Sequence, residues 1–174
     1  MPDSPSATTA SLASLARLRR ELETDRHAMR TRAAEAQAVL GRWDEAARDV
    51  AQLALAAVSL HGWYTALEAA IERVARQLDG DLPRGERWHQ ELLSQAFVQV
   101  PGVRPPILDA ELENELLALL AFRHFFRHAY STPLDPVRLE QDLGRLHRVA
   151  GRADQRLGDF LAFLEAAQEA LLRG

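Results

Sequence analysis

One short stretch of the chain gathers the residue types that could do chemistry. Residues 121–130 read AFRHFFRHAY and include Arg123, His124, Arg127 and His128. On a helix each residue advances by about 100°, so these four side chains fall within about 140° of one another and form one polar stripe, with aromatic residues on the remaining face. Arginine binds phosphoryl oxygens through a planar pair of N–H donors, and histidine exchanges protons near neutral pH. The stretch therefore indicates phosphate chemistry.

Two other interpretations of this stretch are open. The four residues could form a solvated basic face with two exposed histidines. His124 and His128 could also bind zinc, because they are spaced i and i+4. No Glu-x-x pattern lies between them and no third ligand stands at a motif spacing, so we predict neither a metal site nor a cofactor.

The composition predicts one helical domain. The chain has 174 residues, of which 47% are hydrophobic and 26% charged, enough to bury a core. It has no cysteine and no lysine, which excludes thiolate zinc sites, cysteine nucleophiles and lysine nucleophiles. A net charge of -4 argues against broad binding to nucleic acid. The longest apolar run is about half a membrane span and no secretory signal is evident, so we expect a cytoplasmic protein with no membrane contact.

The helices that position the stretch can be placed from proline, glycine and capping signals. We predict an all-α, single-domain, up-and-down helical bundle of about five helices. Asp44, Asp109 and Asp135 are the predicted N-caps, and Pro136 is a favourable first residue of the last helix. The expected segments are a flexible tail over 1–8, an N-terminal helix within 9–43, and a bundle over 44–173 with helices at about 44–78, 85–98, 110–130 and 136–172.

Arg123, His128 and Tyr130 match the Arg-x4-His-x-Tyr signature of the HEPN superfamily, and the chain resembles its HepT-like ribonuclease toxins. Three further stretches resemble motifs of one HepT-like subfamily, namely HGWYTALE at 61–68, LPRGERWHQELL at 82–93 and GVRP at 102–105. The resemblance covers about residues 50–165. Residues 1–45 are not matched.

The resemblance implies a metal-independent endoribonuclease toxin whose partner is a minimal nucleotidyltransferase antitoxin. It implies a homodimer with a composite site, in which Arg123 and His128 promote attack of the ribose 2′-OH on the adjacent phosphate. His124 and Arg127 would support that site, and Tyr130 would receive AMP from the antitoxin. The alternatives are a non-catalytic HEPN module that binds RNA or a nucleotide, and a helical partner protein of a nucleotidyltransferase.

Other polar and aromatic residues are predicted to have structural roles. We predict that Trp88 and His89 are packing and capping residues at the start of the third helix, and that His61 is structural or solvated. Glu111, Glu113 and Glu115 lie in the first turns of the fourth helix, where they complement its dipole.

Overall fold

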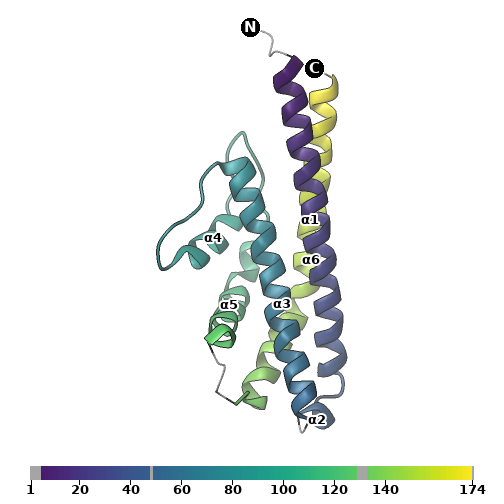
Figure 1. Cartoon of the computed structure of the whole chain (residues 1–174), viewed down its shortest axis with the longest axis vertical. Coiled ribbons are helices and arrows are strands. Elements are labelled where there is room, and N and C mark those ends of the chain that lie inside the picture. Colours follow the sequence, from purple (N-terminus) through teal and green to yellow (C-terminus); the bar gives the residue numbers. More distant parts are fainter. Residues whose placement is uncertain (1–4, 48, 129–132, 174) are drawn as a thin grey trace.

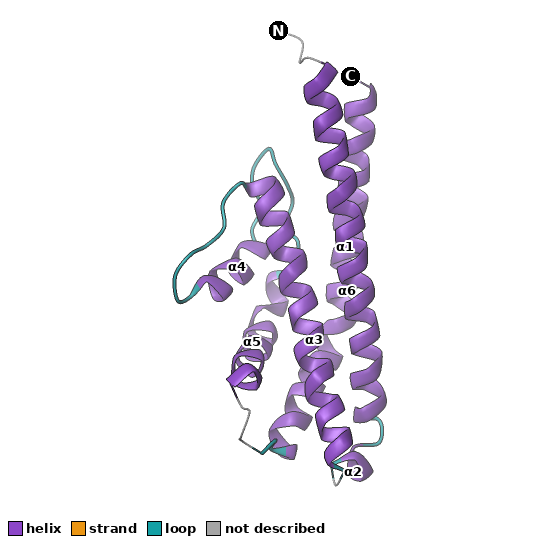
Figure 2. Ribbon diagram, in the orientation of Figure 1, coloured by secondary structure: helices purple, strands orange, loops and turns teal. Residues whose placement is uncertain are grey.

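The computed structural model describes residues 5–47, 49–128 and 133–173, which form an all-α bundle with no strand (Figures 1 and 2). The predicted fold class is confirmed. The elements are α1 (Pro5–Leu40), α2 (Trp43–Ala46), α3 (Val50–Val74) with a π-helical continuation η1 (Ala75–Asp79), α4 (Trp88–Ala96), the 3-10 turn η2 (Ala110–Leu112), α5 (Glu113–His128) and α6 (Pro136–Arg173).

The central helix of the bundle is α3. It contacts α1, α4, α5 and α6, and α1 also runs beside α6 along most of its length (Figure 1). Leucine, alanine and aromatic side chains from these helices form a single core, in which Leu22 of α1, Trp63 of α3 and Phe160 of α6 are almost fully buried. The N-terminal helix therefore packs into the same core as the rest of the bundle.

Several helix starts differ from the prediction. α1 begins at Pro5, inside the expected tail, since proline suits the first turn of a helix. Asp44 does not cap the second helix; the extended Asp49 does, and its Oδ1 accepts a hydrogen bond from the Ala51 amide at 2.8 Å. α4 begins at Trp88 rather than near Gly85, because Gly85 has a φ of 95° and cannot be helical.

The two later caps give one confirmation and one correction. Asp135 caps α6 as predicted, since its Oδ1 accepts from the Val137 amide at 3.0 Å. Asp109 makes no capping hydrogen bond. Its carboxylate instead pairs with Arg152 and Arg156 of α6, and this ion pair fixes the start of the segment that leads into α5.

The segment Val50–Asp79 is long and apolar enough to cross a membrane by length and composition, which corrects the expectation that no segment is. Its most apolar 18-residue window has a mean hydropathy of 1.2, and 44% of that window is buried inside the bundle. Leu60, Leu67 and Ile71 belong to the core. An apolar helix of this kind is also what the centre of a helical bundle requires.

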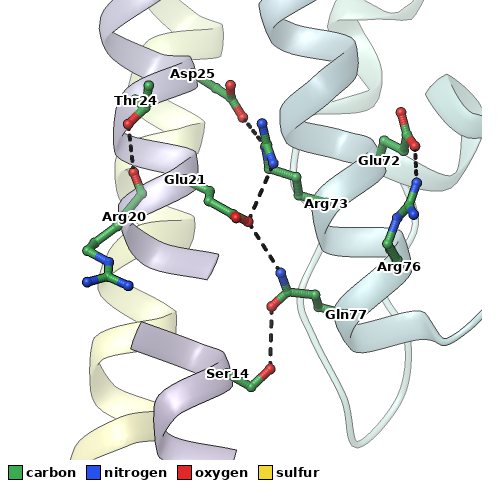
Figure 3. Close-up of polar contacts among 9 residues, drawn as sticks. All are labelled: Ser14, Arg20, Glu21, Thr24, Asp25, Glu72, Arg73, Arg76 and Gln77. Carbon is green, nitrogen blue, oxygen red and sulfur yellow. Dashed lines mark hydrogen bonds and ion pairs between the residues drawn. The ribbon is translucent and has the colours of Figure 1, made fainter. Parts of the chain in front are cut away.

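Charged side chains join α1 to the helices beside it. Arg73 of α3 donates from Nε to Asp25 at 2.8 Å and also pairs with Glu21, which accepts a hydrogen bond from Gln77 (Figure 3). Burial raises the pKa of Asp25, although the hydrogen bond and charge of Arg73 oppose that effect. On the α6 side, Asp154 accepts hydrogen bonds from both Arg26 and Arg30.

A buried arginine organises the proline-rich connection between α4 and α5. The Arg104 side chain is 1% exposed, and its guanidinium donates to both carboxylate oxygens of Asp79 at 2.7 Å. It also donates to three backbone carbonyls, those of Gln95, Val98 and Pro105. The connection is thus tied to both α4 and η1, which sets the position of the following helix, α5.

Candidate active site

Arg123 does not lie on a solvated stripe, which corrects the predicted geometry of α5. It is 6% exposed and belongs to the buried face of the helix, together with Leu116, Leu119 and Leu120. Counted at 100° per residue, these three leucines fall within about 60° of Arg123, whereas His128 is about 140° away. The packing of α5 against the bundle therefore carries this arginine into the interior.

The partner of Arg123 in the interior is Glu68 of α3. Arg123 Nη2 donates to Glu68 Oε1 at 2.7 Å, and the two side chains are 8% and 9% exposed. The remaining nitrogens of the guanidinium, Nε and Nη1, are buried and have no hydrogen-bond partner in the described structure. Because arginine stays charged in proteins, Arg123 is a buried cation with spare donors.

Glu68 also binds His89, so its carboxylate joins three helices. His89 of α4 lies with its Nδ1 2.6 Å from Glu68 Oε2 and is 7% exposed. The imidazole stacks on Trp88, with ring centroids 3.6 Å apart, and makes a T-shaped contact with His124, with ring centroids 4.9 Å apart. We call Glu68, His89, Arg123 and His124 the Glu68 cluster. The prediction that His89 only packs and caps is incomplete, because it forms a buried pair with a carboxylate.

The two remaining described candidates, Arg127 and His128, are exposed at the end of α5. Tyr130 lies outside the described residues. Phe126 is half-buried and packs on Phe122 and on the ring of His61, with centroid separations of 5.9 and 5.4 Å. The structure thus separates the predicted set into an interior pair, Arg123 with the half-buried His124, and an exterior pair.

Burial and nearby positive charge lower the pKa of two histidines, His124 and His61. Burial lowers the pKa of His124, and the charges of His89 and Arg123 lower it further, against an opposing effect of Glu68. Burial also lowers the pKa of His61, with added contributions from Arg123 and Arg127. At neutral pH both rings are therefore available as proton acceptors or neutral hydrogen-bonding groups.

Glu68 was not among the predicted site residues, although the sequence contains a signal for it. Glu68 follows Tyr64 by four residues and precedes Ile71 by three, so it lies on the apolar face of α3. A single carboxylate on such a face requires a buried partner. Tyr64 shares this environment, and burial, reinforced by the charge of Glu68, raises the pKa of its hydroxyl.

The described residues contain no group of three or more His, Asp or Glu side chains that could hold a metal ion. The guanidinium and imidazole groups of the Glu68 cluster can support hydrogen bonding to anions and proton transfer. Both suit a phosphodiester substrate.

Comparison with known proteins places the chain in a family. No curated protein matches the sequence. A family model described as HepT-like protein matches residues 54–164, more than half of the chain. The matched range includes every member of the Glu68 cluster as well as Arg127 and His128, and it excludes α1. The chain therefore belongs to the HepT-like protein family.

Proposed function

We propose that this HepT-like protein is a metal-independent endoribonuclease that acts as the toxin of a toxin–antitoxin pair. Its antitoxin would be a minimal nucleotidyltransferase, and both proteins would act in the cytoplasm. The observation that carries the proposal is the guanidinium of Arg123, which donates to Glu68 from Nη2 and leaves two nitrogens, Nε and Nη1, without a partner. Spare N–H donors on a permanent cation suit the oxygens of a phosphate in its transition state.

In the proposed reaction, the ribose 2′-OH attacks the adjacent phosphorus and the bond to the 5′ oxygen breaks. His128 exchanges protons with the reacting oxygens, and Arg123 stabilises the added negative charge. His124 orients the site and Arg127 holds a flanking phosphate. RNA is the substrate because DNA lacks the 2′-OH nucleophile.

The positions of Arg123 and His128 favour a site shared by two chains. His128 is exposed, whereas Arg123 faces the interior of its own chain, so the two side chains diverge along α5. We propose a homodimer in which the exposed ends of two α5 helices face each other and each His128 serves the Arg123 of its partner. Arg123 Nε and Nη1 are shielded from solvent in this structure, so the side chains that cover them must move before a phosphate can bind.

That shielding also supports a second candidate function. A guanidinium that is buried and neutralised by Glu68 can be a structural element of the bundle. The exposed Arg127 and His128 would then belong to a non-catalytic module that binds RNA or a nucleotide, or to a helical partner of a nucleotidyltransferase. Cleavage activity distinguishes this candidate from the nuclease.

The test uses single-stranded RNA oligonucleotides and the full chain in the presence of EDTA. We expect the wild-type protein to cut RNA and to leave DNA of the same sequence intact. His128→Ala should lower the rate by about 10²–10⁴-fold, while His147→Ala, at an exposed position of α6, should leave it unchanged. Full activity in His128→Ala, or cleavage that depends on a divalent metal, contradicts the proposal. A fully active monomer in light scattering contradicts the shared site.

Control of the toxin is proposed to act at Tyr130. Tyr130 follows Arg127 by three residues in the sequence. An AMP group on it would add bulk and negative charge to this part of the chain and would compete with an RNA phosphate. Incubation with the nucleotidyltransferase and ATP should add one AMP mass at Tyr130 and silence cleavage, and Tyr130→Phe should cleave RNA but resist silencing. An unmodified tyrosine in a fully inhibited complex would show that the antitoxin acts by direct binding.

A further inference from the structure

We infer that His89 is a second catalytic histidine, oriented by Glu68, which accepts the proton of the ribose 2′-OH. The inference rests on the proposed ribonuclease function and divides its proton transfers between two residues. His89 comes from α4, and the geometry around its ring supports this role.

The contact with Glu68 fixes which nitrogen of His89 is basic. Glu68 Oε2 lies 2.6 Å from Nδ1, so the carboxylate accepts the hydrogen of Nδ1–H. The neutral ring then carries its lone pair on Nε2, on the opposite side. Nε2 makes no hydrogen bond to any described residue, and His89 as a whole is 7% exposed. Nε2 is therefore the ring nitrogen that is left to accept a proton from a substrate once the cluster opens.

The ring is held in place from several sides. Trp88 stacks on it at an interplanar angle of 29°, and His124 meets it edge-on. Glu68 is itself fixed, because its other oxygen accepts the hydrogen bond from Arg123. A base that is oriented by a carboxylate and locked by packing has the arrangement that general-base catalysis requires.

The same carboxylate places His89 beside the cation that would stabilise the transition state. Glu68 uses Oε1 for Arg123 and Oε2 for His89, so the two side chains flank one carboxylate. Burying this set in the bundle costs desolvation energy, which an apolar set of the same volume would avoid. A role in chemistry would account for a costly polar cluster in which one imidazole nitrogen of His89 and two guanidinium nitrogens of Arg123 have no partner among the described residues.

The proposed step balances without any further reactant. His89 Nε2 takes the proton of the 2′-OH as the 2′ oxygen bonds to phosphorus. The bond between phosphorus and the 5′ oxygen breaks, and protonated His128 gives its proton to that oxygen. The products are a 2′,3′-cyclic phosphate and a 5′-hydroxyl, with His89 protonated and His128 neutral. Proton exchange with water restores both histidines.

The first experiment measures RNA cleavage against pH for the wild type, His89→Asn and the control His147→Asn. Asparagine keeps a donor near the position of Nδ1 but has no counterpart of Nε2. We expect His89→Asn to lose about 10²–10⁴-fold in rate and to lose the acidic limb of the pH profile, while His147→Asn matches the wild type. Cleavage by His89→Asn within threefold of the wild type, with the acidic limb intact, overturns the inference and leaves the ribonuclease proposal standing.

A second measurement does not depend on activity. Nitrogen-15 NMR of the folded wild-type protein should show the neutral His89 ring as the Nδ1–H tautomer, with an unprotonated Nε2. An Nε2–H tautomer overturns the inference even if His89→Asn fails to fold. Absence of RNA cleavage by the wild type overturns the ribonuclease proposal together with this inference, and so differs from a failure that is confined to His89.

Discussion

Replacing Glu68 by leucine is the sharpest test of the buried cluster. The substitution keeps side-chain volume but removes the acceptor of both Arg123 Nη2 and His89 Nδ1. Arg123 stays charged, is 6% exposed and already has two nitrogens without partners. After the substitution its guanidinium would have no hydrogen bond to any described residue, so the folded state would contain an uncompensated cation.

The expected cost follows from the burial of both partners. Breaking a buried ion pair by removing one member costs about 3–5 kcal/mol in the free energy of unfolding. We expect about 4–5 kcal/mol for Glu68→Leu, because none of the described side chains can replace the carboxylate. Arg123→Met should cost about 1–2 kcal/mol, since methionine fits the apolar neighbours and Glu68 keeps His89. The double variant should also lose only about 1–2 kcal/mol, which corresponds to a coupling energy of about 4 kcal/mol.

The assay is urea unfolding followed by far-ultraviolet circular dichroism, with all four proteins at the same concentration and pH 7. If Glu68→Leu does not accumulate as folded protein, recovery of folding in the double variant is itself the predicted result. A coupling energy below about 1 kcal/mol, within the range for exposed pairs, would refute the view that the Arg123–Glu68 contact is a strongly coupled buried pair.

Three further predictions concern stability elsewhere in the bundle. Although partial burial tends to raise the pKa of Asp154, hydrogen bonds and charge from Arg30 and Arg26 outweigh it and lower the pKa to about 2, from 3.8. The stabilisation is therefore present above pH 3.8 and is lost as the pH falls to about 2. Asp154→Asn should lower the free energy of unfolding by about 1–2 kcal/mol at pH 6. In acid unfolding, the difference in stability between the wild type and this variant should disappear below pH 3. Gly151→Ala should stabilise by about 1 kcal/mol in urea, since an added methyl meets no atom within 4 Å in the helix interior, and an unchanged or lower midpoint would contradict this. Arg104→Ala should cost at least about 3 kcal/mol and make the connection after α4 sensitive to limited proteolysis, whereas wild-type resistance to protease would show that the buried arginine is dispensable.

The fold could be predicted because its signals are local. Proline and glycine mark the ends of the helices, and Asp135 with Pro136 gave the start of α6 correctly. Asp44 and Asp109 were wrong as caps because a capping residue must have extended backbone and a free side chain. Asp49 meets both conditions, whereas the carboxylate of Asp109 forms ion pairs with two arginines of α6. That choice depends on a neighbouring helix and cannot be read from the segment itself.

The sequence grouped Arg123 and His124 on one helix but predicted neither the burial of Arg123 nor its partner Glu68. The candidate residues were arranged within the window 121–130 alone, where Arg123 groups with polar neighbours. Extending the same angular count back to Leu116 and Leu119 places Arg123 in the middle of the apolar face of α5. The pairing with Glu68 lies further beyond sequence reasoning, since 55 residues separate the two partners and only the packing of α3 against α5 brings them together.

The Glu68 cluster changes how the arginine and histidines of α5 are interpreted. The side chains of an exposed stripe would be fixed only when a ligand binds, whereas the Arg123 side chain is fixed by its ion pair with Glu68 before any ligand binds. Preorganised charge is the form in which electrostatic stabilisation of a transition state is strongest, because no reorganisation is required during the reaction. A substrate cannot reach the unpaired nitrogens of Arg123 in this arrangement, because they are buried. A ribonuclease built on this cluster must therefore open it to bind RNA. Any contact that keeps the cover in place, such as a partner protein bound beside the Glu68 cluster, would inhibit the proposed enzyme without contacting Arg123 itself.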